Sequence, residues 1–74
     1  MFLKRVKIFS NVKIVLKNRR IIKGIFLSHD SFMNILLSDC EEFKEKTAFK
    51  TWEFRNLGLC FIRGDSIVSI SIEK

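Results

Sequence analysis

Aliphatic and polar side chains alternate with a period of two near both ends of the chain. Residues 12–17 and 68–73 place an aliphatic side chain at every second position, which is the pattern of a β-strand with one buried face. Residues 21–28 and 33–40 form two further apolar runs bounded by polar turns. Gly24 interrupts the first of these runs, and a glycine inside a strand often marks a sharp bend or a close backbone approach. The pattern therefore predicts four strands outside the middle of the chain.

The middle of the chain is ambiguous because residues 41–56 include many helix formers. Their aromatic side chains nevertheless fit better on two long strands that flank a variable loop near 44–48, with the later strand continuing to a turn at residues 63–65. These aromatic residues are Phe43, Phe49, Trp52 and Phe54. Residues 2–7 fit one to two turns of amphipathic helix. A short N-terminal helix followed by five strands predicts a mainly β fold, a strongly bent antiparallel sheet of the small SH3-like or OB-like barrel type.

A chain of 74 residues is one small domain, and its core rarely contributes more than about 3–5 kcal/mol. A zinc site needs four nitrogen or sulfur ligands, and the sequence has only Cys40, Cys60 and one histidine. One disulfide fits this count, but two reduced, buried thiols in an intracellular protein are the favoured interpretation. The N-terminal region has basic residues throughout and no long apolar run, so neither a signal peptide nor a membrane span is expected. We expect no metal, no cofactor and no membrane partner.

The charge is strongly uneven. Fourteen Lys and Arg against eight Asp and Glu give a net charge of +6, and the first 25 residues contain no acid at all. A basic excess in a small domain favours a polyanionic partner, most simply nucleic acid, although a solvated face is an equally good interpretation of the N-terminal third. The sequence has no nucleophile–base pair, no carboxylate cluster and no glycine-rich phosphate loop, so no enzymatic activity and no small-molecule substrate are predicted.

Two blocks of the chain then become recognisable. Residues 12–43 contain an aliphatic strand, the spacing Arg20-x-x-x-Gly24 and the turn Asp30-x-x-Met33-Asn34, while residues 57–72 contain "IRGD" followed by a short aliphatic strand. In this order, and with a variable loop between them, the blocks resemble the two motifs of the Sm/LSm family. The whole chain, 1–74, is thus expected to be a single Sm domain. "DCEEF", "LGL" and the Val-Ser pair near the C-terminus are most similar to the B-type spliceosomal group.

The resemblance implies a ring. Family members have an N-terminal helix on a five-stranded bent sheet, and they join edge to edge into a seven-membered ring by pairing the fourth strand with the fifth strand of a neighbour. For a B-type protein it implies two D-type neighbours. The implied function is to bind a uridine-rich single-stranded site in spliceosomal small nuclear RNA, as part of the snRNP core for pre-mRNA splicing. The implied location is the nucleus, with assembly in the cytoplasm.

The resemblance also assigns roles in the first turn. Phe32 would stack on a base, an interaction worth roughly 1–3 kcal/mol per base. Asn34 would bind the uracil edge, since a carboxamide offers a donor and an acceptor in one plane. Asp30 would orient Asn34 rather than touch RNA. The alternative for Phe32, in the absence of the resemblance, is a ring that folds back to cap the core.

In the second turn, Arg63 would cover the other face of the base with its guanidinium plane, and Gly64 would let the backbone approach. Asp65 is the weakest RNA candidate, because it could bond within the turn and repel phosphate. His29, Met33, Trp52 and both cysteines are expected to be packing or turn residues.

Two departures and three alternatives stay open. Arg19 stands where the family usually has glycine, and the 74 residues lack the Pro/Gly/Arg-rich tail of B-type proteins, so we expect no recruitment through such a tail. The chain could instead be a subunit of an LSm ring that binds RNA 3′ ends in RNA processing or decay. It could form a homo-heptamer of the archaeal kind. It could also be a small barrel for protein or membrane interaction, with Phe32 in the core.

Overall fold

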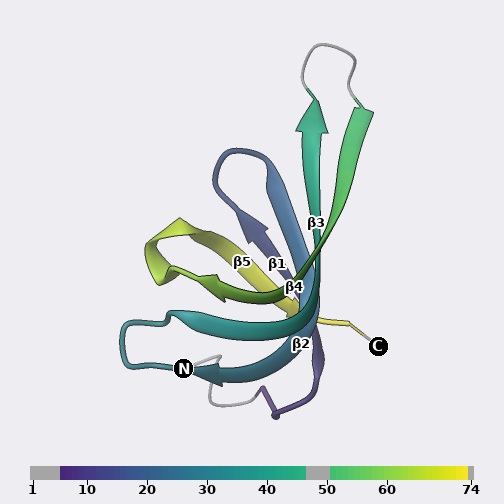
Figure 1. The fold of residues 1–74 in the computed structure, drawn as a ribbon. Helices are drawn as coiled ribbons and strands as arrows, with labels where there is room; N and C mark the ends of the chain where they lie inside the picture. The colour runs from purple at the N-terminus through teal and green to yellow at the C-terminus, as the bar shows by residue number, and fades with distance from the viewer. Residues whose placement is uncertain (1–5, 47–50, 74) are drawn as a thin grey trace.

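The protein is an antiparallel five-stranded sheet. The computed structural model describes residues 6–46 and 51–73, with side chains described for 6–44 and 54–73. The elements are β1 (Asn11–Leu16), β2 (Arg20–His29), β3 (Ile35–Lys46), β4 (Thr51–Ile62), the 3₁₀ turn η2 (Gly64–Ser66) and β5 (Ile67–Ile72). The strand order is β4-β3-β2-β1-β5, and every neighbouring pair is antiparallel (Figure 1). The predicted mainly β fold with five strands is confirmed.

The sheet is strongly bent because its long strands change register. The β2–β3 ladder shifts between Lys23 and Ile25, so Gly24 lies at an irregularity, as its mid-strand position predicted. The β3–β4 ladder shifts on both sides of Cys40. Bulges of this kind bend a strand and increase its twist. The ends of β3 and β4 project beyond the other strands as a two-stranded arm (Figure 1).

The core is formed by every second side chain of the strands, on the face of the sheet that points inward. Val12 and Ile14 of β1 and Ile35 and Leu37 of β3 are almost completely buried, together with Cys40. Each of these positions alternates with a more exposed one along its strand, which is the arrangement that the sequence pattern predicted for β1. Both cysteines are free thiols.

The two edge strands do not follow the simple alternation. Leu59 and Phe61 of β4 are 66% and 62% exposed, and Val68 of β5 is 63% exposed. Because β4 and β5 end the strand order, each has one side without a partner strand in the described part of the chain. An exposed apolar edge is a template for pairing with another chain.

The described residues do not support the predicted N-terminal helix. Residues 1–5 lie outside the described part, and residues 6–10 contain a turn at residues 8 and 9 and no helix. The Phe9 N–H donates to the Phe26 carbonyl at 2.7 Å, and the Phe26 N–H donates to the Ser10 carbonyl at 2.9 Å. The backbone of residues 9 and 10 thus bonds to β2 and directs the chain into the sheet. For residues 6 and 7 the helix prediction is therefore wrong.

The third strand also differs from its prediction. It begins at Ile35 rather than at residue 33, because Met33 adopts a φ of 65° and belongs to the preceding turn. It continues to Lys46, and the variable loop predicted near 44–48 falls partly on residues 47–50, which lie outside the described residues. The hairpin between β1 and β2 has positive φ at Asn18 and Arg19, 68° and 58°. The turn thus forms with Arg19 in the left-handed region that glycine normally occupies.

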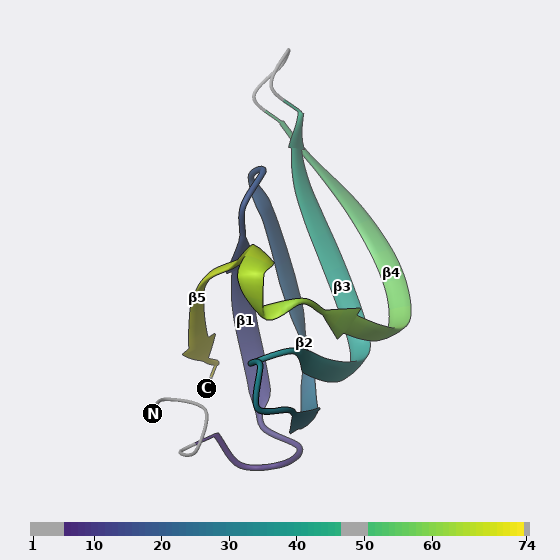
Figure 2. The same cartoon turned by 90° about the vertical axis from the view of Figure 1, so that its left-hand side faces the viewer.

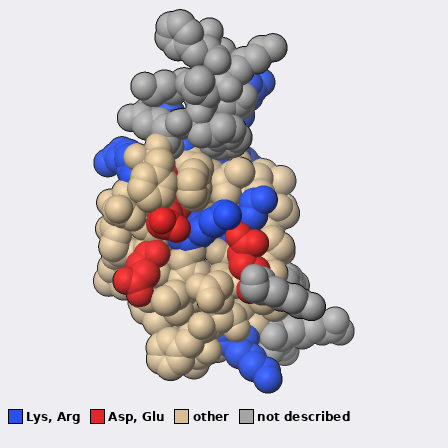
Figure 3. Space-filling model, turned by 90° about the vertical axis from the view of Figure 1, so that its right-hand side faces the viewer, with Lys and Arg blue, Asp and Glu red and all other residues tan. Residues whose placement is uncertain are grey.

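The basic excess is not a single uniform patch. Figure 3 shows one face of the molecule on which Lys and Arg side chains lie among Asp and Glu side chains. Some basic residues of the first 25 lie near acids from the end of the chain; Lys23 Nζ, for example, lies 3.2 Å from Oε1 of Glu73, which follows β5. Among the described residues, no helix is long and apolar enough to cross a membrane.

Candidate functional site

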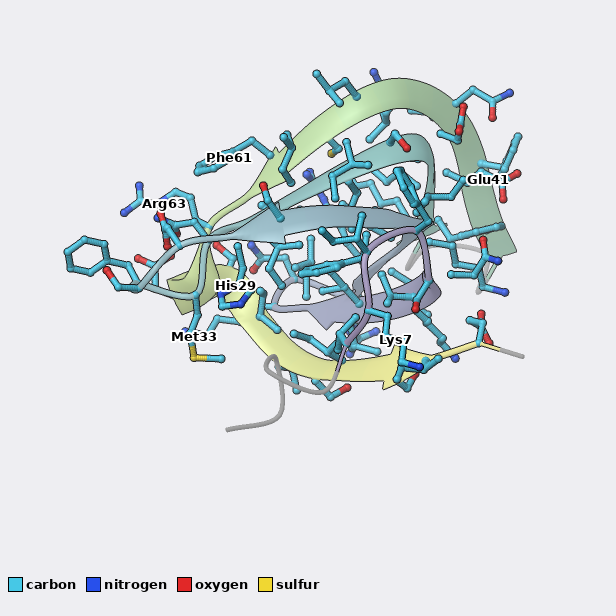
Figure 4. All side chains as sticks on the ribbon, turned by 90° about the horizontal axis from the view of Figure 1, so that it is seen from below. Lys7, His29, Met33, Glu41, Phe61 and Arg63 are labelled. Atoms are coloured by element: carbon cyan, nitrogen blue, oxygen red, sulfur yellow. The ribbon has the colours of Figure 1, made fainter. Side chains whose placement is uncertain are left out.

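Two turns that lie thirty residues apart in the sequence meet at one end of the sheet. The first joins β2 to β3 and the second joins β4 to β5 through η2 (Figure 2). Their direct link is a hydrogen bond of 2.8 Å that the Gly64 N–H donates to Asn34 Oδ1. In Figure 4, His29, Met33 and Arg63 lie at this end of the molecule.

Asp30 organises the first turn. Its Oδ1 accepts hydrogen bonds from the backbone N–H groups of Phe32 (2.9 Å) and Asn34 (3.0 Å), and its Oδ2 accepts one from Asn34 Nδ2 (2.9 Å). Short polar side chains that bond the backbone ahead of them favour this kind of turn. The Met33 N–H also donates to the Asp30 carbonyl at 3.1 Å. The predicted orienting contact of Asp30 with Asn34 is thus present.

These bonds also affect the ionisation of Asp30. Desolvation opposes the charged form, but the side-chain and backbone hydrogen bonds from Asn34, the backbone N–H of Phe32 and the nearby His29 favour it. The net result is that the pKa of the Asp30 carboxyl lies below its ordinary value.

Gly64 permits the two turns to touch. A Cβ built at this position would lie 2.5 Å from the Phe32 carbonyl oxygen and 2.9 Å from that of Met33, both of them backbone atoms. Only a residue without a side chain fits this contact. The close approach at Gly64 is therefore an approach between two parts of the protein.

Both ends of the Asn34 carboxamide are engaged. Its oxygen accepts from Gly64 and its nitrogen donates to Asp30, which fixes the orientation of the amide without ambiguity. A carboxamide has two N–H donors and two acceptor lone pairs, so one of each is left. Asn34 can therefore hold the two turns together and still offer one donor and one acceptor to a ligand.

Two flat side chains extend from this anchored pair of turns into solvent. The Phe32 side chain belongs to a residue that is 80% exposed, so the core-cap alternative does not describe its position. The Arg63 side chain is 75% exposed, and its Nη2 lies 3.2 Å from Asp65 Oδ2. The site therefore presents an aromatic ring and a guanidinium group on a rigid base.

The remaining candidates have structural roles. His29 Nδ1 lies 3.2 Å from the Asp30 carbonyl oxygen, and Met33 packs against the core. Cys40 is buried and Cys60 half-buried, and the side chain of Trp52 lies outside those described. The Asp65 contact with Arg63 at 3.2 Å is the bond within the turn that the sequence analysis considered for Asp65, whereas the bond between Asn34 and Gly64 was not predicted. No local signal marks the bond between Asn34 and Gly64, because its two residues lie thirty positions apart in the chain.

The groups that meet at this site are hydrogen-bonding, aromatic and cationic groups. Within residues 6–46 and 51–73 no group of three or more His, Cys, Asp or Glu side chains lies together as a metal site. The site combines an exposed aromatic ring, a cation and a fixed amide.

Comparison with known proteins gives a consistent result. The LSM domain family matches residues 4–72. A putative snRNP Sm-like protein of Aeropyrum pernix is 40% identical over 60 residues, covering 81% of this chain and 70% of that protein. A probable small nuclear ribonucleoprotein-associated protein B of Caenorhabditis elegans is 43% identical over 67 residues, covering 84% of this chain and 42% of that protein. The chain spans less than half the length of the protein B relatives that it matches.

Solved structures agree on the fold. A heptameric archaeal Sm protein superposes with a TM-score of 0.73 at 28% identity, covering 90% of each chain. A chain of the NatC complex bound to CoA gives a TM-score of 0.77 at 28% identity, covering 90% of this chain and 79% of that chain. With the family match over nearly all of its length and the two family turns joined at one site, this chain belongs to the LSM domain family of Sm and Sm-like proteins.

Proposed function

We propose that the protein is a subunit of an Sm-type ring that binds a uridine-rich single-stranded segment of spliceosomal small nuclear RNA. The observation that carries this proposal is the bonded pair of turns, in which Asp30, Asn34 and Gly64 form a rigid base under the exposed Phe32. Sequence reading on RNA is practical on single strands because their base edges are free.

In this proposal a base lies between the Phe32 ring and the Arg63 guanidinium plane. The remaining N–H and lone pair of Asn34 match the carbonyl and imide N–H of a uracil edge. Arg63 Nη2 donates a hydrogen bond to Asp65 Oδ2 at 3.2 Å, which partly neutralises the guanidinium charge. This favours stacking of the guanidinium plane on a base over a contact with phosphate. Gly64 contributes by allowing the turns to meet.

The exposed edge strands support a ring. Pairing of β4 with the β5 of a neighbour would cover Leu59, Phe61 and Val68, and closure of a ring removes every open edge. The relatives named small nuclear ribonucleoprotein-associated protein B support a place in a small nuclear ribonucleoprotein. The hetero-heptamer with D-type neighbours in the snRNP core for splicing is the arrangement that the B-type resemblance implies. We place it in the nucleus, with assembly in the cytoplasm, and as a binding subunit rather than an enzyme.

The test separates stacking from packing. Because the Phe32 side chain is exposed, Phe32→Ala should leave the melting temperature of the assembled ring nearly unchanged and weaken oligo-uridine binding by about 1–3 kcal/mol. Phe9→Ala removes another exposed phenylalanine, which lies in the segment before β1 and not in either turn, and it should change neither quantity. Unchanged RNA affinity of Phe32→Ala, together with a lower melting temperature, would refute the proposed role of Phe32.

Two other functions use the same fold. An LSm ring that binds RNA 3′ ends in processing or decay would contain the same turns, and the RNAs that copurify with the protein would identify it. The NatC structural match, and Xenopus laevis NatC auxiliary subunits at 36% identity, favour an auxiliary subunit of a protein complex as the second candidate. Copurification with an acetyltransferase and without Sm proteins or RNA would support that candidate. Assembly of a ring from this chain alone, measured by native mass spectrometry, would instead support a homo-heptamer.

A further inference from the structure

A row of apolar side chains crosses the face of the sheet opposite the core. Ladder pairing aligns Val15 with Ile21, Ile21 with Phe43, and Phe43 with Phe54. The rings of Phe43 and Phe54 have centroids 5.3 Å apart and are tilted by 53°. Phe54 is about half exposed, so the row ends in an open aromatic surface. An antiparallel sheet that presents aromatic rings on one face is a known kind of platform for unpaired bases.

Beside this row, two lysines face each other. Lys13 of β1 is the direct ladder partner of Lys23 of β2. Like charges directly opposite each other on a sheet are destabilising, and a bound anion reduces this repulsion. The two lysines line a hollow of about 250 Å³ together with Ile21 and Phe43, and this lining includes no carboxylate.

The two lysines differ in their surroundings. Lys23 Nζ lies 3.2 Å from Glu73 Oε1 and 5.7 Å from the centre of the Phe43 ring, so its charge is partly compensated. Glu41 is also its ladder partner on β3. Lys13 has no ion-pair partner in the described part of the chain. Within the hollow, Lys13 is therefore the better contact for a phosphate.

We propose that this hollow is a second RNA contact, which holds one nucleotide of the strand that continues beyond the uridine tract. Its base stacks on the Phe43 ring and its phosphate is bound by Lys13, a combination of aromatic and cationic groups typical of single-strand binding. Single-stranded RNA fits better than a protein segment, because the hollow combines an aromatic ring with Lys13, whose charge is not compensated within the described residues, in a chain of net charge +6.

The contact is separate from the paired turns. Glu41, which borders it as the ladder partner of Lys23, lies at the opposite end of the molecule from Arg63 in Figure 4. A short oligonucleotide bound at the turns cannot then reach it, whereas a longer strand can. The proposal goes beyond the function proposed above, and the two can fail independently.

The test uses the assembled ring and two probes, an oligo-uridine with one nucleotide per ring subunit and one about three times as long. Phe43→Leu keeps an apolar side chain but removes the stacking face, so it should weaken the long probe about five-fold or more and leave the short probe unchanged. Lys13→Gln should flatten the salt dependence of long-probe binding by about 0.7 in log–log slope per copy of the chain. Lys7→Gln removes the same charge outside this face and is the matched control.

A variant that should bind RNA more tightly gives a result that misfolding cannot explain. Glu73→Gln frees the ammonium of Lys23 and should tighten long-probe binding and steepen its salt dependence. The proposal is overturned if Lys13→Gln and Lys7→Gln give equal salt slopes, if Phe43→Leu weakens both probes alike, or if Glu73→Gln does not tighten long-probe binding. It is also overturned if these variants leave RNA binding intact and instead lose a protein component of the particle, which would assign the face to that protein.

Discussion

Substitution of Gly64 by alanine should disrupt the contact between the two turns. The added Cβ would lie 2.5 Å and 2.9 Å from two backbone carbonyl oxygens, which no side-chain rotation can relieve. Overpacking of this kind costs typically 1–3 kcal/mol. Moving the turns apart also lengthens the 2.8 Å bond from the Gly64 N–H to Asn34, which contributes about 0.5–1.5 kcal/mol. The expected loss of unfolding free energy is therefore about 2–4 kcal/mol.

That loss is large for a chain of this size. At about 0.05–0.15 kcal/mol per residue, a domain this small has a total stability of roughly 4–11 kcal/mol. Thermal unfolding by circular dichroism, in the same assembly state as the wild type, should show a melting temperature lower by at least about 10 °C. Oligo-uridine binding should weaken as well, because Asn34 loses its anchor.

Gly58 provides the matched control. It has a φ of +72° and no atom within 4 Å of an added Cβ, so Gly58→Ala introduces only backbone strain of about 1–2 kcal/mol. We expect it to lower the melting temperature without weakening RNA binding. The double variant Gly64→Ala/Asn34→Ala should be less destabilised than the sum of the single variants by about 1 kcal/mol, since both remove the same bond. Strict additivity, or equal effects of the two glycine variants on RNA affinity, would refute the linked-turn interpretation.

Three further predictions follow from local features. Arg19→Gly should raise the melting temperature by several degrees, because it relieves a non-glycine residue at φ 58°, and a lower melting temperature would show that the Arg19 side chain matters more than the strain. The pKa of Asp30 is lowered in the fold, so its contribution to stability is present above the ordinary pKa of about 4 and is lost as the pH falls through the lower folded-state pKa. Denaturation between pH 7 and 3 should therefore show a smaller loss of stability in acid for Asp30→Asn than for the wild type. Parallel curves for the two proteins would contradict this. Burial, with the neighbouring Cys60 thiol, raises the pKa of Cys40 to about 12, so the contribution of Cys40 to stability is complete below the ordinary value of 9.0 and declines between 9.0 and about 12. At pH 8, mass spectrometry after alkylation should find Cys40 unmodified in the native protein. Rapid labelling of Cys40 would disprove its protection.

Local sequence patterns predicted the parts of the fold that depend on local chemistry. The alternation in residues 12–17 identified β1, because a strand with one buried face must repeat every two residues. The family resemblance implied that Asp30 orients Asn34, and the structure shows this contact as a local one, since a short carboxylate bonds to backbone groups within a few residues of itself. In both cases the interacting groups are close in the chain, so the local sequence is enough to predict the local structure.

The same local patterns failed where the chain's environment decides. Val68 lies in an alternating segment and was expected to be half-buried, yet it is exposed because β5 is an edge strand with no described partner on one side. The amphipathic pattern of residues 2–7 predicted a helix, but the following residues bond to β2. The burial and pairing of a residue depend on which strands become neighbours, and a short sequence segment does not contain that information.

By itself, then, the sequence determined the strands, the turn chemistry and the family motifs of this protein. Only the tertiary structure decided that Asn34 and Gly64, thirty residues apart, share a hydrogen bond, and that Phe32 projects into solvent instead of covering the core. It also placed Lys13 opposite Lys23 and beside an aromatic ring. The physical reason is that each of these facts depends on the bend and register of the sheet, which arise from contacts between residues far apart in the chain.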